Sequence, residues 1–136
     1  AGFTDGTPWL AMNPNYRQIN VREQEARTDS VLAYYRRLVH LRKADAYRET
    51  FTYGIFEPAY QEMADVFAYY RVSGESGQRI LVAANFGTDA VSLPLAYPCR
   101  QVLLSNLRAE SAVETACEKA NALTLESCEV AVIELG

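Results

Sequence analysis

The sequence predicts a mostly β fold, an antiparallel β-sandwich that is preceded by an irregular segment and one amphipathic helix. Beyond residue 50, short runs rich in aromatic and β-branched residues recur about every ten residues, with turn formers between them. No helical period separates these runs, which favours antiparallel pairing in a sandwich. The hydrophobic share of 49% and the charged share of 22% are typical of a globular domain with its own core.

The first 20 residues have neither a helical nor an alternating period. Trp9, Leu10, Met12 and Tyr16 lie among glycines and prolines. Apolar side chains spaced in this way need another surface to cover them. A long irregular connection of this kind is usually a functional loop.

An amphipathic helix is predicted to follow this segment, over residues 28–45. Thr28 is the expected N-cap, and Asp29 places a negative charge at the positive end of the helix dipole. The later turns carry arginine and lysine, which the C-terminal end of a helix favours. The apolar stripe consists of Val31, Leu32, Tyr35, Leu38 and Val39.

The remaining chain, residues 50–136, contains the predicted strands. They are Thr50–Tyr60, Val66–Val72, Arg79–Phe86, 91–95, Arg100–Ser105, Leu123–Leu125 and Cys128–Leu135. The SGESGQ sequence at 73–78 is a hairpin connection, and Pro94 marks an edge strand. The polar stretch Asn106–Asn121 fits either a long loop or a short helix.

Composition excludes several classes of partner. The net charge of −4, from 13 basic and 17 acidic residues, gives no electrostatic basis for nucleic-acid binding. No apolar run approaches the roughly 20 residues that span a membrane. No sequence feature calls for a cofactor.

The cysteines indicate neither a disulfide framework nor a metal site. Cys99, Cys117 and Cys128 are an odd number without C-x-x-C spacing, and His40 is the only histidine. We therefore expect reduced thiols in a cytoplasmic protein and no bound metal, with one disulfide as the alternative. His40 itself, near the end of the predicted helix, is expected to be a helix-surface residue.

Four segments carry a resemblance to a known family. They are AGFTDGTPWLAMNPNYRQINV, DSVLAYYRRLVHLRK, VFAYYR and ILVAANF. Together they resemble glycoside hydrolase family 13, in its branch of oligo-1,6-glucosidases and α-glucosidases, which includes dextran glucosidases, trehalose synthases and sucrose isomerases. The resemblance implies that residues 1–27 are the last loop of a (β/α)8 barrel, 28–45 its last helix, and 50–136 the C-terminal sandwich of a longer protein.

The same resemblance implies that the chain holds no catalytic residue. Retaining glycosidases place two carboxyl groups about 5–5.5 Å apart across the scissile bond. In family 13 an aspartate nucleophile, a glutamate acid/base and a second aspartate lie on earlier barrel strands, in motifs that have no counterpart here. The acids near the barrel part are expected to cap helices and solvate loops.

Asn13 and Tyr16 are the candidate substrate-binding residues. Loops at the C-terminal ends of barrel strands build the active-site face, where Asn13 can hydrogen-bond sugar hydroxyls and Tyr16 can stack on a sugar ring. A structural role is favoured for both, with the asparagines holding turns around Pro14 and Tyr16 pinning the loop. Core packing is likewise favoured over a carbohydrate platform for the aromatic run Phe67, Tyr69 and Tyr70.

Three functions follow from the resemblance. The favoured one is the C-terminal portion of an α-glucosidase that acts on α-glucosidic oligosaccharides, in which the sandwich stabilises the barrel without doing chemistry. The alternatives are a trehalose synthase or sucrose isomerase relative, and a non-enzymatic carbohydrate-binding or transporter-associated module. We expect the 136-residue chain alone to be inactive. Because the apolar groups of residues 1–43 lack a cover, we also expect the chain to self-associate through them or to leave about its first 25 residues loosely held.

Overall fold

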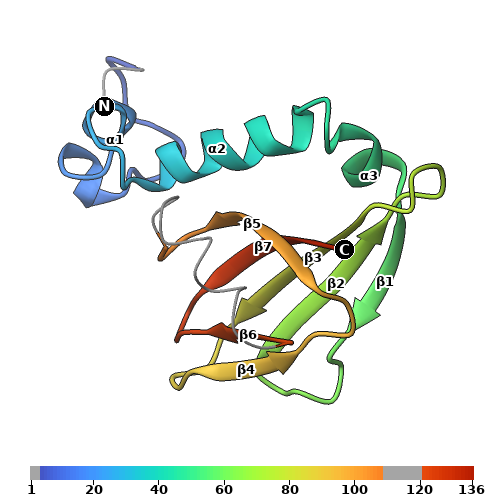
Figure 1. Ribbon diagram of the computed structural model, residues 1–136. Helices are drawn as coiled ribbons and strands as arrows, with labels where there is room; N and C mark the ends of the chain where they lie inside the picture. The colour runs from blue at the N-terminus through green and yellow to red at the C-terminus, as the bar shows by residue number, and fades with distance from the viewer. Residues whose placement is uncertain (1–3, 109–120) are drawn as a thin grey trace. The chain divides into compact units, whose positions relative to one another are not determined.

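The computed structural model describes residues 4–108 and 121–136 of the chain (Figure 1). The chain divides into two compact units, residues 1–39 and 40–136. In the described part, no helix combines the length and the apolar character needed to cross a membrane.

The first unit contains more regular structure than the sequence predicts. The segment expected to be irregular through residue 27 includes a 3-10 helix, η1 (Pro14–Arg17), and the short helix α1 (Val21–Glu25), so that expectation is wrong in part. Asparagine side chains cap both helices. The Asn13 Oδ1 accepts a hydrogen bond from the Asn15 amide at 3.2 Å, and the Asn20 Oδ1 accepts one from the Glu23 amide at 3.0 Å.

Helix α2 (Val31–Lys43) begins later than predicted, because Ser30 and not Thr28 caps it. The Ser30 hydroxyl accepts a hydrogen bond from the Ala33 amide at 3.1 Å and donates one to the Gln24 carbonyl at 2.8 Å. This second bond ties the cap to α1. Within α2 no residue is buried. Of the predicted apolar stripe, Val31, Tyr35 and Leu38 are exposed, whereas Leu32 and Val39 are half-buried.

A third helix, α3 (Arg48–Tyr53), occupies part of the segment that was predicted to be a strand from Thr50 onward. The correction has a tertiary cause. The Thr50 hydroxyl donates a hydrogen bond to Gln78 Oε1 at 2.5 Å, and the Arg71 guanidinium donates to the carbonyl oxygens of Thr50 and Phe51 at 3.4 and 3.2 Å. These contacts satisfy helix carbonyls that a strand would have offered to its neighbour.

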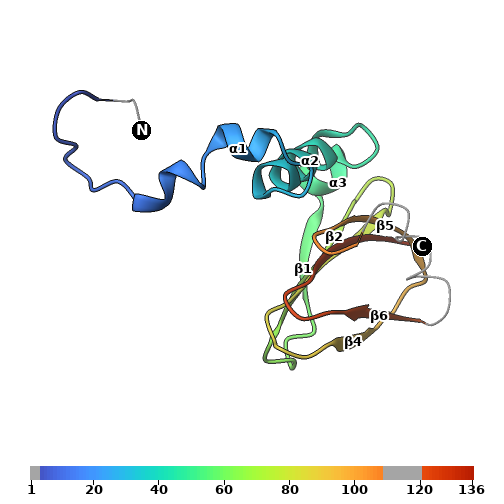
Figure 2. The same cartoon turned by 90° about the vertical axis from the view of Figure 1, so that its left-hand side faces the viewer.

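The strands of the second unit form two antiparallel sheets, which Figures 1 and 2 show facing one another. The five-stranded sheet has the order β1-β2-β3-β7-β5, and the two-stranded sheet pairs β4 with β6. The strands are β1 (Ile55–Ala59), β2 (Val66–Val72), β3 (Arg79–Asn85), β4 (Val91–Pro94), β5 (Cys99–Ser105), β6 (Ala122–Leu125) and β7 (Val130–Leu135). The predicted antiparallel sandwich is thus confirmed.

The core lies between the two sheets. On β3, Leu81 and Ala83 face it, and the alternate residue Ile80 lies on the outer face of the five-stranded sheet. The smaller sheet covers the core with leucines, among them Leu93 and Leu125, which are fully buried. Removal of these side chains from water is the main stabilising contribution to the sandwich.

Two further expectations can be compared with the structure. The connection at 73–78 is a hairpin turn, closed by a 2.9 Å hydrogen bond from the Ser73 amide to the Gln78 carbonyl. Cys128 is free and exposed, as expected. Cys99 is disulfide-bonded, so for this residue the expectation of a reduced thiol is wrong and the alternative of one disulfide holds. Cys117 and most of the stretch Asn106–Asn121 lie outside the described residues.

Candidate functional site

The most buried charged group of the sandwich is the carboxylate of Glu129, which has none of its side-chain surface exposed. It accepts hydrogen bonds from Arg108 Nε and Nη2 at 2.6 and 3.0 Å, and from the Ser105 hydroxyl at 2.8 Å. The backbone amide of Glu126 adds a fourth, at 2.9 Å. Because each of these donors is aimed at the carboxylate, the group is held in place by its neighbours and has no free lone pair directed toward a ligand.

The electrostatics of this group favour the charged form. Burial opposes ionisation, but the hydrogen bonds from Arg108, the Glu126 amide and Ser105 together outweigh it, so the pKa of Glu129 lies below its ordinary value of 4.5. A general acid needs the opposite shift, toward neutral pH. Glu129 is therefore a structural anion.

A second buried carboxylate, that of Glu134, lies on the outer face of the five-stranded sheet. It accepts hydrogen bonds from the side-chain amides of Gln78 and Gln101 at 2.9 and 3.0 Å. The same Gln101 amide donates to the hydroxyl of Tyr47 at 2.7 Å, and Gln78 accepts from Thr50. This chain of hydrogen bonds joins the start of α3 to the sheet.

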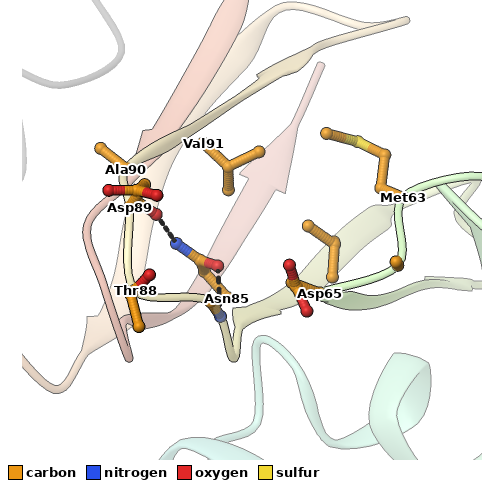
Figure 3. A pocket seen from close by; sticks show the side chains of 10 residues that line it. Met63, Asp65, Asn85, Thr88, Asp89, Ala90 and Val91 are labelled. Carbon is orange, nitrogen blue, oxygen red and sulfur yellow. Dashed lines mark hydrogen bonds between the residues drawn. The ribbon is translucent and has the colours of Figure 1, made fainter.

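A depression lies between the β1–β2 and β3–β4 connections, with a volume of about 310 Å³ (Figure 3). Asp65, Asn85, Thr88 and Asp89 are its polar lining residues, and Met63 is among its apolar ones. Figure 3 shows the Asn85 side chain directed toward the backbone of Asp89, with Asp65 on its other side. Both carboxylates belong to exposed residues.

The Asn85 side chain is engaged within the protein through its amide nitrogen and its carbonyl oxygen. Its amide nitrogen donates to the carbonyl oxygens of Asp89 and Glu126 at 2.8 and 3.0 Å, and its Oδ1 accepts from the Gly87 amide at 2.9 Å. The buried amide therefore holds two loops together. Among the described residues, no group of three or more histidine, cysteine or acidic side chains is placed to hold a metal ion.

Tyrosines and one arginine form a cluster at another edge of the sandwich. The Arg79 guanidinium lies 4.2 Å from the ring centroid of Tyr97 and pairs with Glu57 at 3.2 Å. The hydroxyl of Tyr60 donates to the Pro94 carbonyl at 2.7 Å, and burial raises the pKa of Tyr60. A phenol that remains protonated and bonded to a backbone carbonyl is a structural anchor and not an acid or base.

The aromatic run of β2 is divided between the two faces, as alternation predicts. Tyr70 packs against the core, which confirms the expectation for that residue. Phe67, on the opposite face of the strand, is 56% exposed. Its ring contacts Tyr69 at 5.8 Å between centroids, and Tyr69 contacts Phe56 of β1 at 4.8 Å. We call Phe56, Phe67 and Tyr69 the outer aromatic surface.

The candidate substrate-binding residues lie together in η1. Asn13 caps this helix, while the ring of half-buried Tyr16 lies against Arg17, whose guanidinium carbon is 5.7 Å from the ring centroid. The Tyr16 hydroxyl accepts a hydrogen bond from Arg17 Nε at 3.3 Å. Sugar binding by either residue stays a prediction. His40 is exposed on α2, as expected.

Comparison with known proteins shows which proteins the chain is homologous to. The family model described as "Alpha amylase, catalytic domain" matches residues 1–54. The chain is 37% identical over 114 residues to the glucan 1,6-α-glucosidase of Streptococcus pneumoniae. This match covers 84% of the chain. The chain is homologous to one part of the sequence of family 13 glycoside hydrolases. It is also 34% identical to the oligo-1,6-glucosidase of Parageobacillus thermoglucosidasius. That match covers 84% of this chain.

A solved structure of this family gives a similar result. The isomaltulose synthase of Klebsiella sp. LX3 superposes with a TM-score of 0.81 and 31% identity over 99% of this chain. That superposition covers 23% of the synthase. The chain likewise spans about a fifth of the length of the curated glycoside hydrolases it matches.

Proposed function

We propose that this chain is the C-terminal part of an α-glucosidase of the oligo-1,6-glucosidase type, which hydrolyses α-glucosidic bonds in short oligosaccharides with retention of configuration. The observation that carries the proposal is the pair of curated relatives named glucan 1,6-α-glucosidase and oligo-1,6-glucosidase, each matched over 84% of this chain. The engaged side chains of the sandwich also support it, because they provide no candidate for independent chemistry.

In this proposal the parts of the chain have separate roles. Residues 1–27 are the last loop of a (β/α)8 barrel, 28–45 its last helix, and 50–136 the C-terminal sandwich. The sandwich stabilises the catalytic barrel and does no chemistry itself. If the loop reaches the sugar pocket, Asn13 and Tyr16 are its candidate contacts with substrate, since barrel enzymes build their active sites from such loops.

The test of this function uses the complete open reading frame that encodes the chain. The purified product should release glucose from isomaltose and p-nitrophenol from p-nitrophenyl α-glucoside, while the 136-residue chain alone should release neither. Turnover by the short chain would refute the assigned division of roles. A complete product that cleaves no α-glucoside would refute the glucosidase assignment.

A second candidate is a family 13 enzyme that isomerises sucrose. The superposition on isomaltulose synthase at 31% identity favours it specifically. The same assay separates the two functions when sucrose is included. A glucosidase releases glucose and fructose, whereas an isomerase converts most of the sucrose into an isomeric disaccharide of glucose and fructose.

Self-association of the short chain follows from its exposed apolar residues. In the first unit Trp9 is 93% exposed and Val31 78% exposed. We propose that residues 1–43 contact a second copy when no barrel covers them. Sedimentation of the chain should show dimers or larger species, and Val31→Lys should reduce them, whereas a strictly monomeric chain would contradict the proposal.

A cytoplasmic location also remains a proposal. The sequence supports it through the expected reduced state of the three cysteines. Because Cys99 is disulfide-bonded, that support is lost for this cysteine. Fractionation of cells that express the complete protein would test it directly.

A further inference from the structure

Asn20 lies where the 3-10 helix η1 gives way to helix α1, and both ends of its side chain are engaged. Its amide nitrogen donates to the carbonyl oxygens of Tyr16 and Arg17, the last two residues of η1, at 3.1 and 3.2 Å. Its Oδ1 accepts a hydrogen bond from the Glu23 amide in α1 at 3.0 Å. One side chain therefore joins the end of one helix to the start of the next.

Apolar packing within the chain does not fix the angle between these two helices. Helix η1 has four residues and α1 has five, and neither contains a buried residue. Helices of this length are not stable by themselves in water. In the described part of the first unit, the side-chain hydrogen bonds that reach both helices come from Asn20. The orientation of η1 relative to α1 therefore depends on this residue.

Helix α1 is in turn held by α2. The buried Ser30 hydroxyl donates to the Gln24 carbonyl of α1 at 2.8 Å, and Gln24 Oε1 accepts from the Leu32 amide in the first turn of α2 at 2.9 Å. A continuous series of polar contacts thus runs from α2 through α1 to η1. Because η1 contains Tyr16 and is capped by Asn13, the two candidate substrate-binding residues lie at the end of this series.

We propose that Asn20 is a positioning residue for substrate binding, which orients η1 so that Asn13 and Tyr16 contact the sugar in the complete enzyme. The proposal rests on the proposed function, in which residues 1–27 are a loop of the catalytic barrel. Asn20 bonds the backbone of Tyr16 and not its phenol, so it acts on the substrate only through η1. Loss of a contact that contributes to binding alone raises KM and leaves kcat unchanged.

The alternative role of Asn20 is that of a helix cap alone, and its side-chain chemistry separates the two roles. The cap of α1 needs only the Oδ1 acceptor, whereas the bonds to η1 need the amide hydrogens. Aspartate caps helices as well as asparagine does, but the ionised carboxylate cannot donate a hydrogen bond. Asn20→Asp therefore keeps the cap of α1 and removes both bonds to η1.

The test measures isomaltose hydrolysis by the complete protein and by its Asn20→Asp variant. We expect KM to rise about three- to tenfold, because the binding-competent orientation of η1 is then populated for only a fraction of the time. The value of kcat should stay within about twofold, and the thermal unfolding midpoint should stay within about 2 °C of the wild-type value.

Asn106→Asp is the matched control, because Asn106 makes the same two kinds of bond in the sandwich. Its amide nitrogen donates to the Cys128 carbonyl at 2.9 Å, and its Oδ1 accepts from the Val130 amide at 2.8 Å. This variant makes the same chemical change in the second unit and should leave KM unchanged. An equal rise of KM in both variants would refute a specific role for Asn20.

A double-mutant cycle shows whether the effect passes through η1. If Asn20 acts by placing Tyr16, then Asn20→Asp should raise KM less in a Tyr16→Ala background than in the wild type. The inference is refuted if Asn20→Asp leaves KM unchanged, or if it raises KM by the same factor in both backgrounds. A fall in kcat at constant KM, which partial unfolding would produce, also refutes it.

Failure of the proposed function would give a different result. The amides of Gln18 and Ile19 both bond the Asn15 carbonyl at 2.9 Å, and in the complete protein Asn20→Asp should accelerate their hydrogen exchange about tenfold. A protein that hydrolyses no isomaltose but shows this acceleration refutes the proposed function, and the orientation of η1 by Asn20 stands. Unchanged exchange at both amides refutes the inference whether or not the protein is active.

Discussion

Replacement of Arg108 by methionine tests whether the buried ion pair with Glu129 supports the sandwich. Methionine keeps much of the side-chain volume and removes both hydrogen bonds to the carboxylate, of 2.6 and 3.0 Å. The Glu129 side chain is fully buried, so its charge would remain without a partner cation in that position. Removal of one partner of a buried pair costs about 3–5 kcal/mol of unfolding free energy. We expect the lower end, about 3 kcal/mol, because Ser105 and the Glu126 amide still donate to the carboxylate.

The assay is urea unfolding of the chain followed by far-ultraviolet circular dichroism. Fluorescence is unsuitable, because the single tryptophan of the sequence, Trp9, is 93% exposed in the first unit and does not report on the sandwich. With a typical dependence of the unfolding free energy on urea concentration, a loss of about 3 kcal/mol lowers the urea concentration at the unfolding midpoint by about 1–3 M. The matched control is Arg36→Met, which removes an exposed pair with Glu25 and should cost less than about 1 kcal/mol.

A double-mutant cycle then isolates the interaction. Glu129→Gln removes the charge but keeps the shape, and Arg108 can still reach solvent because 20% of its side chain is exposed. The combined variant should lose less stability than the sum of the single losses, since removing both partners leaves no unpaired charge. Additive losses, or a loss below about 1 kcal/mol for Arg108→Met, would refute the reasoning.

The dependence of stability on pH provides an independent test of the ion pair between Arg108 and Glu129. In the wild type the pKa of Glu129 is lowered, so its contribution is present above the ordinary value of 4.5 and is lost as the pH falls through the lower folded value. In Arg108→Met, burial without the guanidinium should raise that pKa. The contribution of Glu129 to the unfolding free energy then changes sign. The loss of unfolding free energy in the variant, relative to the wild type, should be largest at neutral pH and shrink as the solution is acidified. A deficit that does not change with pH would contradict this assignment.

Three further substitutions have defined costs. Gly54→Ala places a Cβ 2.4 Å from the Thr50 carbonyl oxygen, so chemical denaturation should show a loss of about 1–3 kcal/mol. Ser30→Ala removes the cap of α2 at a cost of about 1 kcal/mol, which hydrogen exchange should detect in α2 and not in the strands. Asn85→Ala removes the bonds to two loop carbonyls, and thermal unfolding should reveal a loss of at least about 2 kcal/mol. Unchanged stability in any of the three would contradict the contact concerned.

The strands were predictable because the pattern of apolar residues directly reflects burial in a two-layer sandwich. Strands β2 and β3 lie within one residue of their predicted bounds, since each alternates core and outer positions between clear turn signals. Residues 50–53 were misassigned because Thr50 and Phe51 have strand propensity. The hydrogen bonds that the Thr50 hydroxyl donates to Gln78 and that Arg71 donates to the Phe51 carbonyl override this propensity. Such long-range bonds have no signature in a local pattern.

The helix start and the buried charges were missed for a related reason. Three consecutive residues, Thr28 to Ser30, can each cap a helix, and the bond between the Ser30 hydroxyl and the Gln24 carbonyl is seen only in the folded chain. Glu129 does not stand out in the sequence, because its partner Arg108 lies 21 residues away. That the chain holds no catalytic residue stays a prediction, which depends on the lack of the family's catalytic motifs in the sequence.

The buried polar side chains of the described sandwich are engaged in the way that a supporting domain requires, which agrees with the proposed function. These side chains, including Asn85, Glu129 and Glu134, are bonded to one another or to the backbone. A catalytic group must keep bonding capacity for its substrate, whereas a supporting group is most stabilising when it keeps none. The described sandwich also leaves apolar side chains exposed, at the outer aromatic surface. Apolar surface gains free energy from contact with another protein surface, so the unsatisfied part of this domain favours docking over chemistry.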